Sequence, residues 1–135
     1  MKQQTSDLRI ATKDDIPHIL LLLEKLYTLS CYANYVSWDV KSTRESLEKA
    51  IDAPNEDAVV LCNSKGILVA SSLTQMFNSK EKTACELALY GEDKGTVKLL
   101  MKAYKYWAKK TGCTSILYGG LKSPNEVERY IVRKL

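Results

Sequence analysis

Cysteine and histidine, the side chains that most often ligate zinc or serve as nucleophile and base, are sparse in this sequence. The four cysteines, Cys31, Cys62, Cys85 and Cys113, form no CxxC pair, and His18 is the single histidine. This count excludes a Cys/His zinc site, and it excludes a Ser-His-Asp triad unless His18 serves. We expect His18 to be a surface or half-buried helix residue and the thiols to be reduced. The sequence thus predicts no metal.

Four lysines form the most regular charged pattern of the chain. Lys98, Lys102, Lys105 and Lys109 are spaced by 4, 3 and 4 residues, which places them on one face of a helix. The favoured interpretation is a solvated face opposite the apolar one. A surface for nucleic acid is the weaker alternative, because no aromatic ring or arginine fork accompanies these lysines and phosphate-only binding is weak and salt-sensitive. We therefore expect no nucleic-acid partner.

Composition places the chain among globular proteins and excludes several other classes. Hydrophobic residues make up 45% and charged residues 27% of 135 residues, which excludes a disordered or fibrous protein and fits a single domain over residues 1–135. The longest apolar run, residues 19–23, is far too short to cross a bilayer. The first seven residues lack the apolar segment of a signal peptide. We expect a cytoplasmic protein without a membrane partner.

Positive charge is concentrated in the last third of the chain. Residues 1–91 carry 10 Lys/Arg and 12 Asp/Glu, whereas residues 92–135 carry 10 and 4. The formal net charge of +4 is thus a balance of −2 followed by one of +6. A basic C-terminal third suggests an anionic partner there, such as a phosphorylated cofactor, a nucleic acid or an acidic protein.

Hydrophobic periodicity and turn residues predict five strands and four helices. Apolar residues at i, i+3 and i+4 mark the helices, and apolar runs bounded by turn residues mark the strands. A loop that contains three aromatic residues, at 30–40, separates the first two helices. The expected strands are 8–11, 58–62, 67–76, 82–90 and 114–119, and the expected helices are 12–27, 42–51, 96–111 and one from 123 to the chain end.

Capping residues mark the ends of three of these helices. Thr12 suits the N-cap of the first helix, and Gly112 stands where a left-handed residue closes the helix 96–111. Ser123, with proline next and Glu126 three positions on, has the pattern of a capping box. This pattern predicts that the last helix runs from Ser123 to Leu135.

The order β-α-α-β-β-β-α-β-α predicts an α/β (α+β) domain with a mixed, mostly antiparallel sheet and helices on both faces. The strands 82–90 and 114–119 flank a long helix, so we expect them to be parallel neighbours joined by a right-handed crossover. Ligands of open sheets bind beyond the carboxyl ends of strands and near helix N-termini. This edge of the two strands is therefore the predicted site.

Four segments in this order resemble motifs of the GCN5-related N-acetyltransferase (GNAT) family. Residues 8–17 (LRIATKDDIP) resemble its opening strand and first helix, and VVLC and ILVA, at 59–62 and 67–70, resemble its second and third strands. Residues 99–113 (LLMKAYKYWAKKTGC) are similar to its cofactor helix, and Asn125-Glu126 with the ending Arg-Lys-Leu resembles its last helix. The resemblance covers nearly the whole chain and implies the GNAT fold.

The resemblance implies that acetyl-CoA binds in a notch between the strands 82–90 and 114–119 and that a primary amine of a small molecule or protein attacks the acetyl group directly. The family's loop at the cofactor helix usually contains an arginine and two glycines. The corresponding segment here, residues 91–97, keeps one helix-entry glycine, lacks the arginine and contains two acids that repel a pyrophosphate. The implied cofactor-binding residues are Leu87, Leu89, Lys94, Gly95, Thr96, Val97, Lys98 and Asn125.

The resemblance also implies catalytic and substrate-binding residues. Glu86 matches the strand-four glutamate that acts as the base, although a solvent-facing glutamate is the alternative. The family's tyrosine acid falls on Val132 here, so Tyr130 is its displaced candidate, two residues away along the expected helix. In the loop 30–40, Tyr32, Tyr35 and Trp38 would shape the amine pocket, unless they only pack the first two helices together.

The family continues past the Arg-Lys-Leu ending with two more strands, so the resemblance implies a sheet that lacks its last two strands. The strand 114–119 would then have an exposed edge, and we expect a homodimer or a partner strand to pair there. The resemblance leaves two functions open. One is an acetyl-CoA-dependent N-acetyltransferase, and the other is a catalytically degenerate GNAT-like protein that acts as a protein-binding module.

Overall fold

The computed structural model describes residues 7–120 and 129–135. The described strands form one sheet in which spatial order follows chain order. Neighbours pair antiparallel, except that β4 and β5 are parallel and α3 connects them. The strands are β1 (Arg9–Ile10), β2 (Ala58–Asn63), β3 (Gly66–Thr74), β4 (Lys82–Gly91), β5 (Ser115–Gly120) and β6 (Arg129–Lys134), the α-helices are α1 (Ile16–Leu29), α2 (Val40–Asp52) and α3 (Lys94–Lys110), and the 3-10 turns are η1 (Lys13–Asp15) and η2 (Cys31–Asn34).

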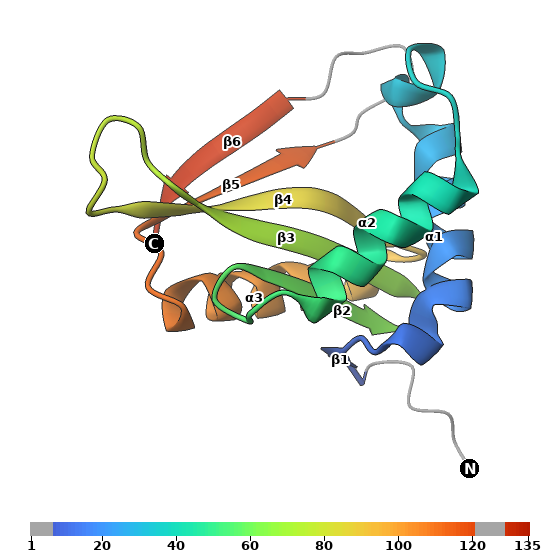
Figure 1. Ribbon diagram of the computed structural model, residues 1–135, viewed down its shortest axis with the longest axis horizontal. Coiled ribbons are helices and arrows are strands. Elements are labelled where there is room, and N and C mark those ends of the chain that lie inside the picture. The colour runs from blue at the N-terminus through green and yellow to red at the C-terminus, as the bar shows by residue number, and fades with distance from the viewer. Residues whose placement is uncertain (1–6, 121–128) are drawn as a thin grey trace.

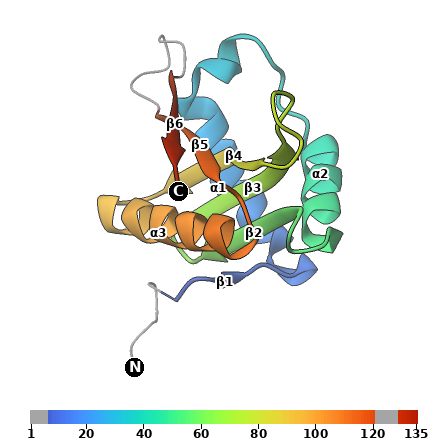
Figure 2. The same cartoon turned by 90° about the vertical axis from the view of Figure 1, so that its left-hand side faces the viewer.

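Helices cover both faces of the sheet (Figure 1), which confirms the predicted fold class. On one face, Leu100 and Tyr104 of α3 pack with Leu68 of β3 in one buried cluster. On the other face, α1 and α2 build a second cluster that includes Ile19 and Ile67. Figure 2 shows α3 and the pair α1 and α2 on opposite sides of the sheet. Both faces of the central strands are thus buried, as their continuous apolar runs require.

The entry into α1 follows the predicted capping chemistry. Thr12 and Asp15 form a capping box, in which the Thr12 N–H donates to Asp15 Oδ2 at 2.8 Å. The Arg9 guanidinium donates to both carboxylate oxygens of Asp15 at 2.6 Å. These hydrogen bonds lower the pKa of Asp15 to about 2, and the Arg9 bond contributes most. The helix therefore begins after one 3-10 turn that an ion pair ties to β1.

Gly112 ends α3 as predicted. Its φ of 87° lies in the left-handed region, and its N–H donates to the carbonyl of Lys109 at 3.2 Å. The next residue, Cys113, turns the chain back into the core and is buried.

The predicted last helix is wrong, because the described part of that segment is the strand β6. β6 pairs antiparallel with β5, from Ser115 opposite Lys134 to Gly120 opposite Arg129. The segment contains Tyr130, Ile131 and Val132, and aromatic and β-branched residues favour strands. The sheet thus has one strand more than the sequence predicted. β6 also occupies the β5 edge at which a homodimer or partner strand was expected.

The described thiols differ in burial, and His18 lies at the surface as predicted. Cys62 and Cys113 are buried free thiols and Cys85 is half-buried. Burial raises the pKa of Cys62 and of Cys85. His18 is exposed on α1, with Nε2 3.3 Å from the carbonyl oxygen of Asn63. In the described ranges, no cluster of His, Cys, Asp and Glu suits a metal ion, and no helix is long and apolar enough to cross a membrane.

Candidate functional site

The parallel strands β4 and β5 pair over only three residues each. Thr83 to Cys85 pair with Ser115 to Leu117, and beyond these residues β4 continues with β3 while β5 continues with β6. Figure 1 shows the two strands diverging after the paired segment. The divergence opens at their carboxyl ends, which is the predicted place and the usual ligand position in sheets that contain parallel strands.

A β-bulge in β4 accounts for the divergence. Ala70 pairs with Glu86 and Val69 pairs with Ala88, so Leu87 is an extra residue without a counterpart in β3. A bulge bends its strand and increases the local twist. This bulge begins directly after Cys85, the last β4 residue that pairs with β5. The strand therefore turns away from β5 where its pairing with β5 ends.

Two side chains anchor β5 beside the divergence. The half-buried Glu86 accepts a hydrogen bond from the Gly119 N–H at 3.1 Å, so its carboxylate spans from β4 to β5. The buried Tyr104 of α3 donates its hydroxyl to the Leu117 carbonyl at 2.7 Å. Desolvation raises the pKa of Tyr104, so this phenol stays protonated as a donor. Glu86 was predicted from the sequence, whereas Tyr104 was not, because the apolar face of a helix does not reveal which hydroxyl will find a partner.

The register of β6 brings the second predicted catalytic residue to the same place. Tyr130 pairs with Gly119, the residue whose N–H binds Glu86. Tyr130 was predicted to lie on a helix, with the position of the family's tyrosine at Val132. The strand instead puts the backbone of Tyr130 opposite Gly119 and that of Val132 opposite Leu117. Glu86 of β4 and Tyr130 of β6 thus lie on the two strands that flank β5, both at the level of Gly119.

An acidic side chain caps the N-terminus of α3. The helix begins at Lys94, two residues earlier than predicted, and Asp93 is the N-cap. The Asp93 carboxylate accepts a hydrogen bond from the Thr96 N–H at 2.7 Å, which lowers the pKa of Asp93. The turn from β4 is tight, because a Cβ on Gly91 would lie 2.9 Å from Cγ2 of Val97. The sequence signal for this cap was the Asp three residues before Thr96.

Lysines from two other elements neutralise the acids of this turn. Lys25 of α1 lies 2.7 Å from Glu92, and Lys65 of the β2–β3 turn lies 3.3 Å from Asp93. The Lys25 contact lowers the pKa of Glu92. With the exposed Lys94 and Lys98, four lysines therefore surround two acids at the helix start. The surroundings are net positive, although the Thr96 N–H is already occupied.

The remaining predicted cofactor residues have different surroundings. Leu87, the bulge residue, is 63% exposed. Leu89 packs against the core cluster under α3, and Thr96 is buried. Asn125 lies outside the described residues. Leu87 thus stands free beside the gap, whereas Leu89 has a structural role.

The three aromatic residues of the predicted substrate loop divide into two groups. The Trp38 ring lies 5.6 Å from the Tyr27 ring of α1, centroid to centroid, which is a packing contact. Tyr32 in η2 and Tyr35 after it are exposed. Figures 1 and 2 place η2 at the end of the molecule toward which β4 and β5 diverge. Tyr32 and Tyr35 are therefore the candidates to meet a substrate.

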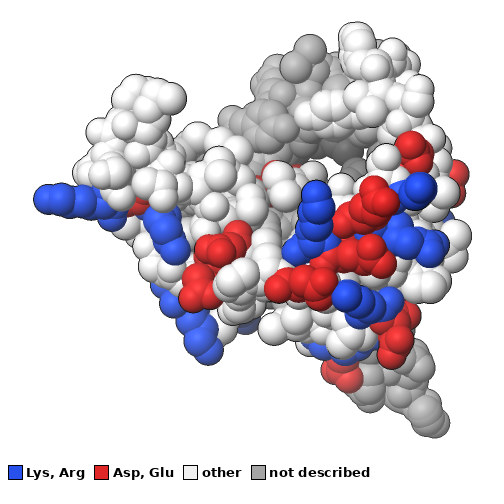
Figure 3. Space-filling model, viewed as in Figure 1, with Lys and Arg blue, Asp and Glu red and all other residues white. Residues whose placement is uncertain are grey.

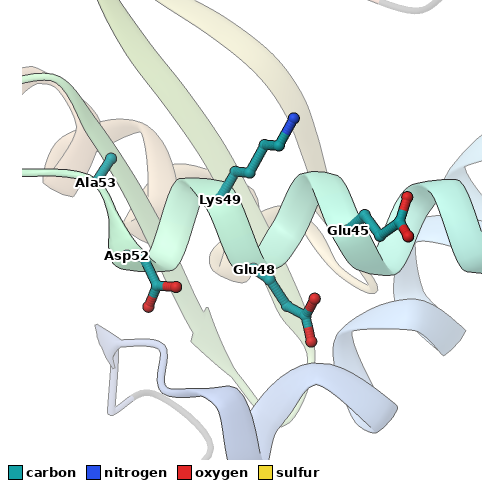
Figure 4. Close-up of a pocket in the computed structure, with 5 residues that line it drawn as sticks. All are labelled: Glu45, Glu48, Lys49, Asp52 and Ala53. Carbon is teal, nitrogen blue, oxygen red and sulfur yellow. The ribbon is translucent and has the colours of Figure 1, made fainter.

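A separate open pocket of about 490 Å³ lies on α2 and the residue that follows it. Its lining is Glu45, Glu48, Lys49, Asp52 and Ala53. Lys49 points away from Glu48 and Asp52 (Figure 4), and charges of both signs are interspersed over this face (Figure 3). The pocket contains none of the predicted site residues.

Solved structures share this arrangement of strands and helices. Neither a protein-family model nor a curated protein sequence matches the chain. The aminoglycoside 6'-N-acetyltransferase AAC(6')-IG from Acinetobacter haemolyticus superposes with a TM-score of 0.64 at 18% identity, over 82% of this chain and 76% of that one. Ribosomal-protein-alanine N-acetyltransferase from Brucella melitensis gives 0.61 at 15% identity, over 84% and 73%. A putative acetyltransferase from Agrobacterium tumefaciens gives 0.61 at 11%, over 82% and 78%.

The chain has the GNAT fold. The fold expectation from the sequence motifs is thereby confirmed, and in this GNAT fold the notch between β4 and β5 is the gap that begins after Cys85 and Leu117. At these identities the similarity concerns the fold, so the chemistry has to be argued from the residues at the gap.

Proposed function

We propose that this chain is an N-acetyltransferase that transfers the acetyl group of acetyl-CoA to a primary amine of a small molecule or a protein. The observation that carries the proposal is the gap between β4 and β5, with Glu86 and Gly119 hydrogen-bonded across it. Two of the similar structures are named for amine-bearing acceptors, an aminoglycoside and a ribosomal-protein alanine. Their names support the acceptor class, whereas the acceptor itself is for experiment to identify.

The residues at the gap fit acetyl-CoA in charge and in shape. Acetyl-CoA, when bound, supplies an activated acetyl thioester and carries anionic phosphates. Lys94 and Lys98 are exposed at the start of α3, where positive charge and the helix dipole both favour an anion. Gly95 leaves the backbone of that turn uncovered, since the nearest atom to an added Cβ is Asp93 Oδ1 at 3.5 Å. The negative charge of Asp93 opposes this binding. Acetyl-CoA should therefore bind more weakly here than at a helix start without a capping carboxylate.

Two proton-transfer roles fall to residues beside the gap. An amine attacks only in its neutral form, so Glu86 accepts a proton from the acceptor ammonium at its carboxylate. Tyr130, opposite Gly119 in the register, would donate its hydroxyl proton to the thiolate that leaves when the thioester bond breaks. Tyr32 and Tyr35 are the proposed contacts of the acceptor. These assignments retain the sequence predictions for all four residues.

The occupied helix start favours a second function, a degenerate GNAT-like fold that acts as a protein-binding module. Asp93 takes the Thr96 N–H, and Glu92 adds a further negative charge where phosphates are expected. A module of this kind would not bind acetyl-CoA, and its binding to a protein partner would not change on substitution of Glu86 or Gly95. Acetyl-CoA binding alone therefore distinguishes the two functions.

Calorimetry with acetyl-CoA tests the proposed function first. We expect a dissociation constant between about 1 μM and a few hundred micromolar, within the range of ordinary Michaelis constants. Transfer is then measured as thiol release with an aminoglycoside or an alanine-terminated peptide as acceptor. Glu86→Gln should retain acetyl-CoA binding and lose at least about tenfold in kcat. Glu24→Gln, which removes an exposed carboxylate on α1, is the matched control.

Absence of acetyl-CoA binding at hundreds of micromolar would reject the enzyme and leave the binding module. Equal rates for Glu86→Gln and Glu24→Gln would reject Glu86 as the base while leaving the cofactor assignment intact.

A further inference from the structure

Helix α3 carries all of the excess positive charge of the chain. It contains six lysines and no acidic residue or arginine. The whole chain has 20 basic and 16 acidic residues, so the remainder holds 14 basic residues against 16 acidic ones. In the part of the chain that the structure describes, no lysine of α3 belongs to an ion pair. This concentration of unneutralised charge is unlike the mixed charges over α2 (Figure 3).

Five of these lysines form a row along the outward-facing side of the helix. At 100° per residue they fall within an arc of about 80°, and they extend over about 22 Å of the helix axis. The buried side chains of α3, among them Leu100, Tyr104 and Trp107, lie on the opposite side. All five are exposed and form what we call the lysine row, Lys94, Lys98, Lys102, Lys105 and Lys109.

The fold adds an aromatic ring and an arginine, which the sequence argument lacked. Tyr106 is 66% exposed on α3, and the Lys110 ammonium lies 5.6 Å from the centroid of its ring. Arg133 of β6 is exposed and pairs with Ile116. Paired residues share one face of a sheet, and Ile116 packs in the cluster under α3. Arg133 is therefore on the same face of the sheet as α3.

These features fit a phosphate backbone better than a protein or a membrane. Lysine is depleted from the cores of protein interfaces, whereas it binds phosphates as a point charge. A helix that lies on a membrane inserts an apolar side, and the apolar side of α3 is already buried in the core. Aromatic rings beside basic residues stack with unpaired bases.

We propose that the lysine row, with Tyr106 and Arg133, binds single-stranded nucleic acid through its phosphates and without sequence preference. Contact of all five lysines with phosphates predicts that log K falls with log salt concentration with a slope of about −3.5. Lys94 and Lys98 also belong to the proposed cofactor site, whereas Lys102, Lys105 and Lys109 lie farther along α3. The test therefore changes only the last three lysines, and its outcome does not depend on acetyl transfer.

Fluorescence anisotropy with a labelled DNA strand of about 20 nucleotides, between about 50 and 200 mM salt, measures both the affinity and the slope. In the test variant, Lys102, Lys105 and Lys109 become Gln, which should weaken binding at least about tenfold at the lower salt and reduce the slope by about 2. In the control variant, Lys41, Arg44 and Lys49 of α2 become Gln. It loses the same charge from an exposed surface and should keep both values.

Several results would overturn this assignment. One is the absence of binding at the lower salt. Another is equal weakening in the two variants, which would show that binding depends only on net charge. Tighter binding of a duplex of the same length would reject the single-stranded ligand. Binding of anionic lipid vesicles or of a polyglutamate peptide as tight as that of the DNA strand would reject the nucleic acid.

Discussion

The carboxylate of Glu86 accepts a hydrogen bond from the backbone N–H of Gly119 at 3.1 Å. Glu86 lies one residue beyond the last β4 residue that pairs with β5, and Gly119 lies two residues beyond the last paired residue of β5. A side chain thus bridges the strands where their backbones have separated. This bond fixes how far apart the two strands stand at the entrance of the gap.

The Glu86 bridge should contribute measurably to stability. Glu86→Gln keeps a carbonyl oxygen that can accept the Gly119 N–H, whereas Glu86→Ala leaves this N–H without its acceptor. We expect Glu86→Ala to lower the free energy of unfolding by about 1–3 kcal/mol and Glu86→Gln by less than about 1 kcal/mol. Urea denaturation measures both values. Equal losses in the two variants would show that the bond does not support the fold.

Tyr104 should support β5 from the helix side. Tyr104→Phe removes the hydroxyl that donates to the Leu117 carbonyl, and we expect a loss of about 1–2 kcal/mol in the free energy of unfolding. Tyr106→Phe makes the same change on an exposed ring of the same helix and serves as the control. A loss no larger in Tyr104→Phe than in the control would contradict the anchoring role.

Asp15 should make the fold acid-sensitive. Its pKa is about 2 in the folded protein, against an ordinary value of 3.8, so the folded state favours the charged form. The stabilisation is therefore complete above about pH 4 and is lost as the pH falls toward 2. We expect Asp15→Asn to lose about 1–2 kcal/mol at neutral pH and to show a flatter decline between pH 4 and 2 than the unmodified chain. Parallel declines would exclude Asp15 as the titrating group.

Gly66 and Gly95 should differ sharply in their tolerance of a methyl group. A Cβ on Gly66 would lie 2.5 Å from Cγ2 of Thr96 and 2.8 Å from Cδ1 of Leu100, so β3 and α3 would have to move apart. We expect Gly66→Ala to cost about 1–3 kcal/mol. Gly95→Ala meets no close atom in the first turn of α3 and should be neutral or stabilising. Thermal unfolding compares the two variants, and similar melting temperatures would contradict the close approach.

Asp93 should control the affinity of the α3 start for anions. Asp93→Ser keeps a side-chain acceptor for the Thr96 N–H and removes the negative charge, so acetyl-CoA should bind severalfold more tightly at little cost in stability. Asp93→Ala loses the cap as well and should cost about 1 kcal/mol in the free energy of unfolding. Calorimetry measures the affinity for acetyl-CoA, and urea denaturation measures the free energy of unfolding. Unchanged affinity in Asp93→Ser would place the phosphates away from this turn.

Local chemistry was enough to predict most of the fold. Thr12 and Gly112 act on residues within one helical turn, and the elements they mark lie where the sequence placed them. The last element failed because two local signals competed. The capping pattern at Ser123 favoured a helix, while the aromatic and β-branched residues from Tyr130 onward favoured the strand that pairs with β5.

Only part of the candidate site could be predicted from the sequence. Glu86 could be placed near the carboxyl end of a strand, because strand and helix alternate around it. Its partner Gly119 is 33 residues away, and their meeting depends on the bulge at Leu87 and on the β5 register. No periodicity encodes that distance. The Asp93 cap was a local signal, but it was interpreted only as a repulsive charge.

The bulge at Leu87 also changes the phase of side chains along β4. Ala84 and Leu89 both face the cluster under α3, although an uninterrupted strand sends residues five apart to opposite faces. Ala88 accordingly faces α1 and α2. If Leu87 paired as a regular strand residue, Ala88 and Leu89 would each turn toward the wrong layer. Deletion of Leu87 would instead keep Ala88 opposite Val69 and Leu89 opposite Leu68, and would straighten β4 toward β5. One surplus residue thus opens the gap while both cores keep their packing, so the width of the gap can change by a single deletion that leaves the two layers intact.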